Sequence, residues 1–136
     1  AIFEQELLKL YSELAGQIDA FYMTIYAARK YERLPYLLKP FYDRDIPIFT
    51  QMGIEVKYGA LMSVSDGTDL KGFGRFAAES IVKVFHGEKP RRIPCIYEHP
   101  PRILLNMDAC RKIGYRPPFD ILLVADDIYS TQGEAR

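Results

Sequence analysis

Apolar residues recur at helical spacing at the start of the chain and then give way to short continuous runs. Five of them lie three or four residues apart, with polar and charged residues between them: Phe3, Leu7, Leu10, Tyr11 and Leu14. This spacing predicts an amphipathic helix that ends near Gly16. Residues 18–25 are mainly apolar, and a run of this length is typical of a strand buried on both faces of a parallel sheet.

Helical and apolar segments continue to alternate in the next part of the chain. Residues 26–44 have a helical pattern that two prolines interrupt. Pro35 suits the first turn of a helix, whereas Pro40 is expected to kink or end it. Residues 46–50 and 60–64 are short apolar runs, so each is a predicted strand.

The remainder of the chain is predicted to hold one long helix and several short elements. The long helix covers residues 70–85, because an apolar stripe runs along it at helical spacing: Phe73, Ala77, Ile81 and Val84. Two β-like runs, a short helix that Gly114 ends, a last helical turn or two and a frayed tail follow in this order: residues 93–97, 103–105, 108–113, 119–125 and 131–136.

The alternation of strands and helices over the first 86 residues predicts an α/β fold. We expect a Rossmann-like parallel sheet flanked by helices, with right-handed crossovers. Ligands of such sheets bind at the carboxyl ends of the strands. The candidate ligand-binding residues are therefore the polar and aromatic side chains that follow the first three predicted strands: Thr24, Tyr26, Gln51, Asp66, Thr68 and Asp69.

Composition narrows the classes of function. The chain has 136 residues, of which 49% are apolar and 26% charged, as expected for one globular domain. Lys and Arg number 18, and Asp and Glu also number 18, so the chain lacks the excess of basic residues typical of nucleic-acid binding. Its apolar runs are far shorter than the roughly 18 residues of a membrane span. No signal peptide is visible and the chain begins with Ala1, which predicts a processed or excised segment.

The candidate chemical motifs predict no catalysis, cofactor or metal site. Cys95 and Cys110 lack the spacing of a zinc site and are expected to be buried thiols, with a disulfide as the alternative in an oxidising compartment. His86 and His99 are isolated and are expected to be structural or surface residues. The acidic pairs at residues 43 and 45 and at 126 and 127 are expected at solvated helix ends.

Two short motifs resemble catalytic or nucleotide-binding loops and are rejected. Gly72 and Gly74 match a GxGxxG/A pattern, but a capping loop separates them from the preceding strand, so close packing of a helix on the sheet explains them better. Asp66 and Thr68 resemble the DxDGT loop of phosphatases, but Val64 stands where the nucleophilic carboxylate would have to be.

Aromatic residues are concentrated between Phe21 and Tyr58. Of these, Tyr26 and Tyr58 are the hardest to assign to a core stripe. A tyrosine with an apolar face and a polar tip suits a ligand cleft, a protein interface or packing beneath a helix, and all three interpretations stay open.

Several stretches resemble one known family when they are taken in order. They cover the helix-to-strand entry, the next two strands, the start and end of the long helix, and the C-terminal part: residues 14–22, 46–49, 56–61, 69–75, 87–90, 106–114 and 125–128. Together they resemble the extracytoplasmic substrate-binding proteins of ABC transporters, and most closely the tryptophan- and tyrosine-type members. The match covers about residues 12–130, and it resembles the second lobe of that type I periplasmic-binding-protein fold with its C-terminal crossover.

The resemblance implies a function and partners. A small molecule, with amino acids and aromatic compounds as the candidate classes, would be held between this lobe and a missing N-terminal lobe, and an ABC permease would receive it. The expected location is the periplasm or another extracytoplasmic space, and a lipid anchor on the full-length protein stays open. Exposure of the face between the lobes predicts that the isolated segment forms homo-oligomers.

The pocket positions depart from the family pattern more than the scaffold positions do. The polar phrase that usually follows the first strand is replaced by Tyr26 and two alanines, and Gln51, Met52 and Gly53 replace the small polar and acidic residues after the second. Two rival interpretations remain: a ligand-sensing domain of the same fold in a signalling or regulatory protein, and a nucleotide-dependent enzyme on a flavodoxin-like sheet. The latter predicts a phosphate-binding loop after the first strand, where this chain has no glycine.

Overall fold

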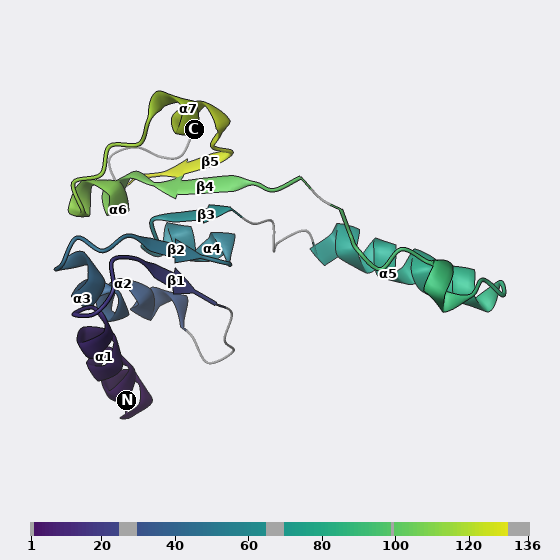
Figure 1. The fold of residues 1–136 in the computed structure, drawn as a ribbon, viewed down its shortest axis with the longest axis horizontal. Helices are drawn as coiled ribbons and strands as arrows, with labels where there is room; N and C mark the ends of the chain where they lie inside the picture. Colours follow the sequence, from purple (N-terminus) through teal and green to yellow (C-terminus); the bar gives the residue numbers. More distant parts are fainter. Residues whose placement is uncertain (1, 25–29, 65–69, 99, 131–136) are drawn as a thin grey trace.

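A five-stranded sheet organises the chain, and one long helix extends away from it (Figure 1). The computed structural model describes residues 2–24, 30–64, 70–98 and 100–130. Within them the strands lie in the order β1-β2-β3-β4-β5. Their bounds are β1 Phe21–Met23, β2 Ile48–Thr50, β3 Met62–Val64, β4 Ile103–Asn106 and β5 Asp127–Tyr129. The α-helices are α1 Ile2–Leu14, α2 Leu34–Leu37, α3 Lys39–Tyr42, α4 Gly53–Lys57, α5 Leu70–Phe85, α6 Met107–Lys112 and α7 Phe119–Val124, with 3-10 turns at Tyr31–Arg33 and Pro90–Arg92.

The sheet is mostly parallel, as the sequence predicts for an α/β fold. Strands β1, β2 and β3 are parallel neighbours, and β5 is parallel to β4. The pairing of β3 with β4 is antiparallel, which the expected all-parallel sheet did not include. The chain leaves the sheet after β3 and re-enters it at β4 from the same edge, so these two strands run in opposite directions.

A cluster of aromatic rings packs α1 and α3 against β1. Phe21 stacks on Phe41 with ring centroids 4.4 Å apart, and Tyr11 meets Phe21 edge-on at 5.3 Å. Phe41 has no exposed surface. This cluster confirms the predicted stripe of the first helix in part: Tyr11 faces the core, whereas Phe3 and Leu10 are 56% and 58% exposed.

The prolines divide the helical region before β2, as expected. Pro35 lies in the first turn of α2, where its missing N–H leaves no helical hydrogen bond unmade. Pro40 does the same for α3, so it begins a new helix instead of kinking the old one. The outcome is two four-residue helices that, with Leu38 between them, pack Leu34, Leu37, Leu38 and Phe41 into the core.

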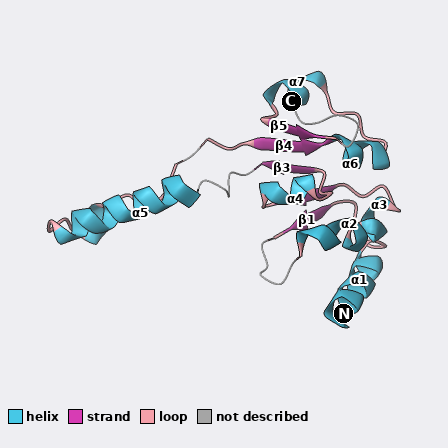
Figure 2. Cartoon of the chain, turned by 180° about the vertical axis from the view of Figure 1, so that it is seen from behind, coloured by secondary structure: helices cyan, strands magenta, loops and turns pink. Residues whose placement is uncertain are grey.

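Helix α5 and the segment that follows it form an arm outside the sheet (Figures 1 and 2). We call residues 70–98 the arm. Helix α5 covers the predicted residues, yet none of its side chains is buried. Pairs of aromatic rings hold the returning segment against the helix: Tyr97 lies 5.5 Å from Phe76 and 6.1 Å from Phe73, between ring centroids. The predicted strand at 93–97 is wrong, because this segment packs on α5 and joins no sheet.

Two further expectations fail in the arm. Gly72 and Gly74 lie within α5, and a side chain at Gly74 would meet nothing within 4 Å, so close packing on the sheet does not explain that glycine. Cys95 is exposed and Cys110 is buried, and both are free thiols. The expectation of two buried thiols therefore holds only for Cys110, and no disulfide joins the two.

Candidate functional site

The carboxyl ends of β1 and β2 lie side by side. The register pairs Met23 with Thr50, and the backbone N–H of Gln51 donates a hydrogen bond of 3.1 Å to the carbonyl of Met23. Two of the candidate ligand-binding residues, Thr24 and Gln51, follow directly on these strand ends, and both are exposed. The sheet therefore brings them together at one edge, as the sequence analysis expects.

The other four candidates lie outside the described residues. Tyr26 belongs to residues 25–29, and Asp66, Thr68 and Asp69 belong to residues 65–69. The described chain enters both segments at the same sheet edge, because Thr24 precedes the first and Val64, the last residue of β3, precedes the second. Their place in the site stays a prediction.

A buried polar network fixes the turn that carries Gln51. The hydroxyl of Thr50 donates to the carboxylate of Glu55 and accepts a hydrogen bond of 3.1 Å from the backbone N–H of Met52. Thr50 and Glu55 are each 2% exposed. Sequence reasoning missed Glu55, although an acid in the first turn of a helix that follows a strand could have indicated it. The network joins the end of β2 to the start of α4 and holds Gln51 on the outside.

Gly53 lets α4 lie close to the sheet. A Cβ at this position would come within 3.1 Å of a methyl group of Leu104 in β4. The side chain of Asn106, at the end of β4, then links α4 to that strand, because its amide nitrogen donates a hydrogen bond of 2.6 Å to the backbone carbonyl of Val56. Its oxygen accepts from the backbone N–H groups of Asp108 and Ala109 and so caps α6.

The arm joins the sheet at the same edge as Thr24 and Gln51. The chain departs after Val64 and returns at Ile103, and these two residues are paired in the β3–β4 register. Next to this return point, Arg102 pairs with Asp127 at 2.8 Å, and the backbone N–H of Ile103 donates to Asp126 at 2.7 Å. The acidic pair at 126 and 127 thus anchors β5 to β4.

Of the remaining candidate residues that the structure describes, Tyr58 has a structural role and His86 lies on the surface. Tyr58 stacks on Tyr31 with centroids 5.7 Å apart and packs against the core, which selects the packing interpretation for this residue. His86 is exposed at the end of the arm, and His99 lies outside the described residues. In the described part of the chain no group of three or more His, Cys, Asp or Glu residues is placed to hold a metal ion.

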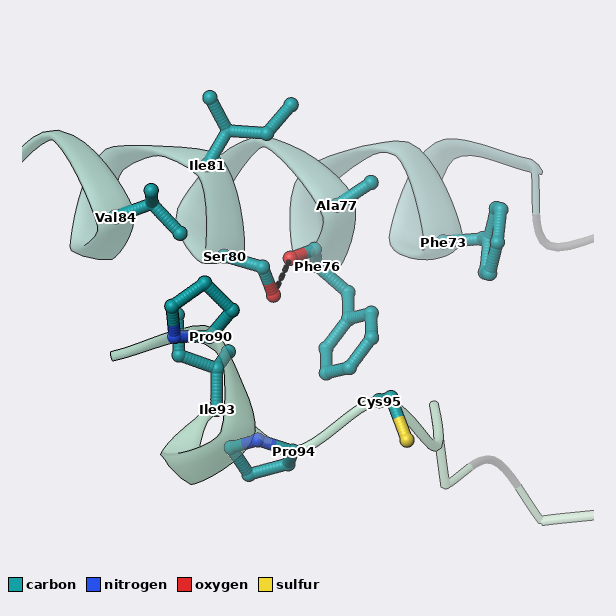
Figure 3. A pocket seen from close by; sticks show the side chains of 10 residues that line it. All are labelled: Phe73, Phe76, Ala77, Ser80, Ile81, Val84, Pro90, Ile93, Pro94 and Cys95. Carbon is teal, nitrogen blue, oxygen red and sulfur yellow. Dashed lines mark hydrogen bonds between the residues drawn. The ribbon is translucent and has the colours of Figure 1, made fainter. Parts of the chain in front are cut away.

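Two hollows in the described part of the chain lie away from the ends of β1 and β2. One of about 390 Å³ runs along the arm between α5 and residues 90–95, where Phe76 points toward the returning segment (Figure 3). Another of about 500 Å³ lies on the sheet, lined by Phe49 and Met62 among others. No helix in the described residues is both long and apolar enough for a membrane crossing.

Comparison with known proteins identifies the family. The family model described as ABC transporter substrate binding protein matches residues 4–128. The chain therefore belongs to the family of ABC transporter substrate-binding proteins, which confirms the resemblance noted in the sequence. No curated protein sequence matches it.

Solved structures share the fold. A conserved domain protein from Vibrio cholerae has a TM-score of 0.69 and 18% identity, and the match covers 93% of this chain and 42% of that one. An ABC domain from Streptococcus pneumoniae in complex with L-Trp has a TM-score of 0.68 and 20% identity, with the same coverage. A substrate-binding protein with adhesive properties from Clostridium difficile, in a ligand-free, open structure, has a TM-score of 0.61 and 23% identity, covering 85% and 38%. The chain thus spans less than half the length of each.

Proposed function

We propose that the chain is the second lobe of a two-lobed solute-binding protein that serves an ABC importer outside the cytoplasm. The observation that carries the proposal is the shared edge at which Thr24 and Gln51 meet and from which the arm departs. Ligands of parallel sheets bind at this edge. The family's members bind solutes, and in this account the lobe binds without catalysis.

The arm supplies the contact with the first lobe. Its helix carries large apolar side chains that the described chain leaves uncovered: Leu70 is 75% exposed and Phe85 83%, and Ile96 on the returning segment is 73% exposed. Apolar surface of this extent on a soluble protein marks an interface. Because the arm starts at the ligand edge, a lobe packed on it would face Thr24 and Gln51 and could close over a solute by hinge motion.

The solute class we propose is an amino acid or a small aromatic compound. The structure from Streptococcus pneumoniae that shares the fold was solved with L-Trp, which makes that amino acid the first probe. Thr24 and Gln51 offer a hydroxyl and an amide, groups that hydrogen-bond the polar end of such a molecule. Tyr26, Asp66, Thr68 and Asp69 are proposed to complete the site.

A binding screen on the complete gene product tests the proposal. Thermal shift with the standard L-amino acids should show a rise in melting temperature with one class, since a ligand at 100 times its Kd stabilises by about 2.7 kcal/mol. Calorimetry should then show that the Gln51→Ala variant binds this ligand about ten-fold more weakly than the wild type, because it has lost one hydrogen bond to the ligand. Gln17→Ala is the matched control, because Gln17 precedes β1 at the opposite end of the strand and its side-chain amide donates to the backbone carbonyl of Glu13. Equal affinity in both variants would place the site elsewhere.

A further inference from the structure

Two buried polar side chains flank the turn that follows β2. Thr50 is the last residue of β2, Glu55 lies in the first turn of α4, and each is 2% exposed. Burial of a hydroxyl and a carboxylate is unfavourable unless hydrogen bonds compensate for the lost contact with water. The hydrogen-bond partners of this pair therefore show which part of the structure the pair holds in place.

The hydroxyl of Thr50 is engaged inside the protein. A hydroxyl has one proton to donate, and that of Thr50 goes to the carboxylate of Glu55. The same oxygen accepts a hydrogen bond of 3.1 Å from the backbone N–H of Met52. Because the proton of Thr50 is already donated and both side chains are buried, neither is placed to contact a solute. An effect of this pair on binding has to pass through the turn.

The turn is held by hydrogen bonds on both sides of Gln51. The backbone N–H of Gln51 itself donates to the carbonyl of Met23 in β1 at 3.1 Å, and the next N–H, that of Met52, donates to Thr50. The carbonyl of Met52 accepts a further hydrogen bond of 2.9 Å from the backbone N–H of Glu55. The exposed side chain of Gln51 thus projects from a backbone that is fixed within the lobe.

Helix α4, which carries Glu55, is itself held against the sheet. The backbone of Gly53 lies so close to Leu104 that a Cβ would come within 3.1 Å of its methyl group. The amide of Asn106 donates to the carbonyl of Val56. Leu104 and Asn106 both belong to β4, which lies two places from β2 in the sheet. The position of Glu55 is therefore set by a strand other than the one whose turn it supports.

We infer that Thr50 and Glu55 are positioning residues for the solute. They hold the turn that presents Gln51, and they raise the affinity without contacting the solute themselves. A group that is held in place before binding loses less conformational freedom when it binds, so a fixed turn gives higher affinity than a loose one. The inference rests on the proposed function, because it takes Gln51 as a solute-binding residue.

A double-mutant cycle on the complete gene product tests the inference by calorimetry. The probe is L-tryptophan or, if that gives no thermal shift, the L-amino acid that gives the largest one. Thr50→Val keeps the shape of the side chain and removes its hydroxyl, and we expect it to weaken binding about five- to ten-fold. In the Gln51→Ala background the same substitution should change the affinity by less than about two-fold, because the side chain that Thr50 positions is absent there.

Controls separate this role from an effect on stability alone. Thr50→Ser keeps the hydroxyl and should bind within about two-fold of the wild type. Ser63→Ala removes a hydroxyl from the neighbouring strand, where Ser63 pairs with Thr50, is 1% exposed and makes no side-chain hydrogen bond within the described residues. This variant should bind like the wild type. Urea unfolding should show that Thr50→Val lowers stability equally with and without Gln51→Ala, so lost stability cannot produce the expected pattern of affinities.

A loss of affinity in Thr50→Val that disappears in the Gln51→Ala background supports the inference. A loss of equal size in both backgrounds, or no loss in either, overturns it and leaves the proposed site standing. A Gln51→Ala variant that binds as tightly as the wild type overturns both. If Thr50→Val does not fold, Glu55→Gln replaces it, because an amide is a weaker acceptor than a carboxylate of the same shape. A loss of about three-fold that disappears with Gln51→Ala is then the supporting result, and any other result overturns the inference.

Discussion

Replacing Asn106 separates two contributions to stability: the N-cap of α6 and the hydrogen bond to Val56 in α4. Its side chain is 6% exposed and does two things: the oxygen caps α6 through Asp108 and Ala109, and the nitrogen donates to the carbonyl of Val56 in α4. Loss of an N-cap costs about 1 kcal/mol, and a buried carbonyl left without its donor costs about 1–3 kcal/mol. Asn106→Ala should therefore lower the free energy of unfolding by about 2–4 kcal/mol.

Asn106→Ser is the control that keeps one contribution. Serine is as good an N-cap as asparagine but is too short to reach Val56, so only the second cost of about 1–3 kcal/mol remains. Urea unfolding followed by circular dichroism measures both variants, and the alanine variant should unfold at a midpoint about 1–2 M below the wild type. If serine were as destabilising as alanine, the cap would contribute nothing. A midpoint unchanged by alanine would refute the reasoning as a whole.

Further predictions concern the core, pH and association. Phe41→Ala removes a fully buried ring and should cost about 3–5 kcal/mol, whereas Phe119→Ala, at a position 71% exposed, should change stability by less than about 0.5 kcal/mol in the same urea assay. Burial raises the pKa of Tyr42, so the folded chain keeps a phenolic proton that the unfolded chain loses near pH 10. The free energy of unfolding should therefore fall as pH rises above about 10. This fall should be smaller in the Tyr42→Phe variant, which has no phenolic proton to lose. The isolated chain should self-associate through the exposed apolar side chains of the arm. Light scattering should show a lower average mass after Leu70→Lys and Phe85→Lys than for the wild type. A wild-type chain that stays monomeric at high concentration would contradict this.

Local patterns identified most elements because local physics determines them. The long helix of the arm was predicted over the residues that form it, because its apolar residues recur at helical spacing. The three parallel strands were predicted from their apolar runs, although each is only three residues long and forms part of its run.

The failures come from contacts that are distant in the sequence. Strand β5 was missed because Asp127–Tyr129 has no strand pattern of its own and is held by pairing with β4. The segment at residues 93–97 has β-forming residues but no neighbouring strand in the described chain, so it packs on α5 instead. The amphipathic stripe of α5 gave no sign that it lies along residues 90–95 and not against the sheet.

The sequence predicted where the candidate site lies better than it predicted which residues form it. The topology rule located Thr24 and Gln51 at one edge, because carboxyl ends of parallel strands coincide. It could not identify Glu55, whose role depends on a buried hydrogen bond to Thr50.

A crystal structure of the complete gene product with the solute identified by the screen tests the central claim most directly. We predict that the solute lies between two lobes and within hydrogen-bonding distance of Thr24 or Gln51, at the carboxyl ends of β1 and β2. A solute bound in the hollow beside Tyr115, or along the arm, would contradict the account.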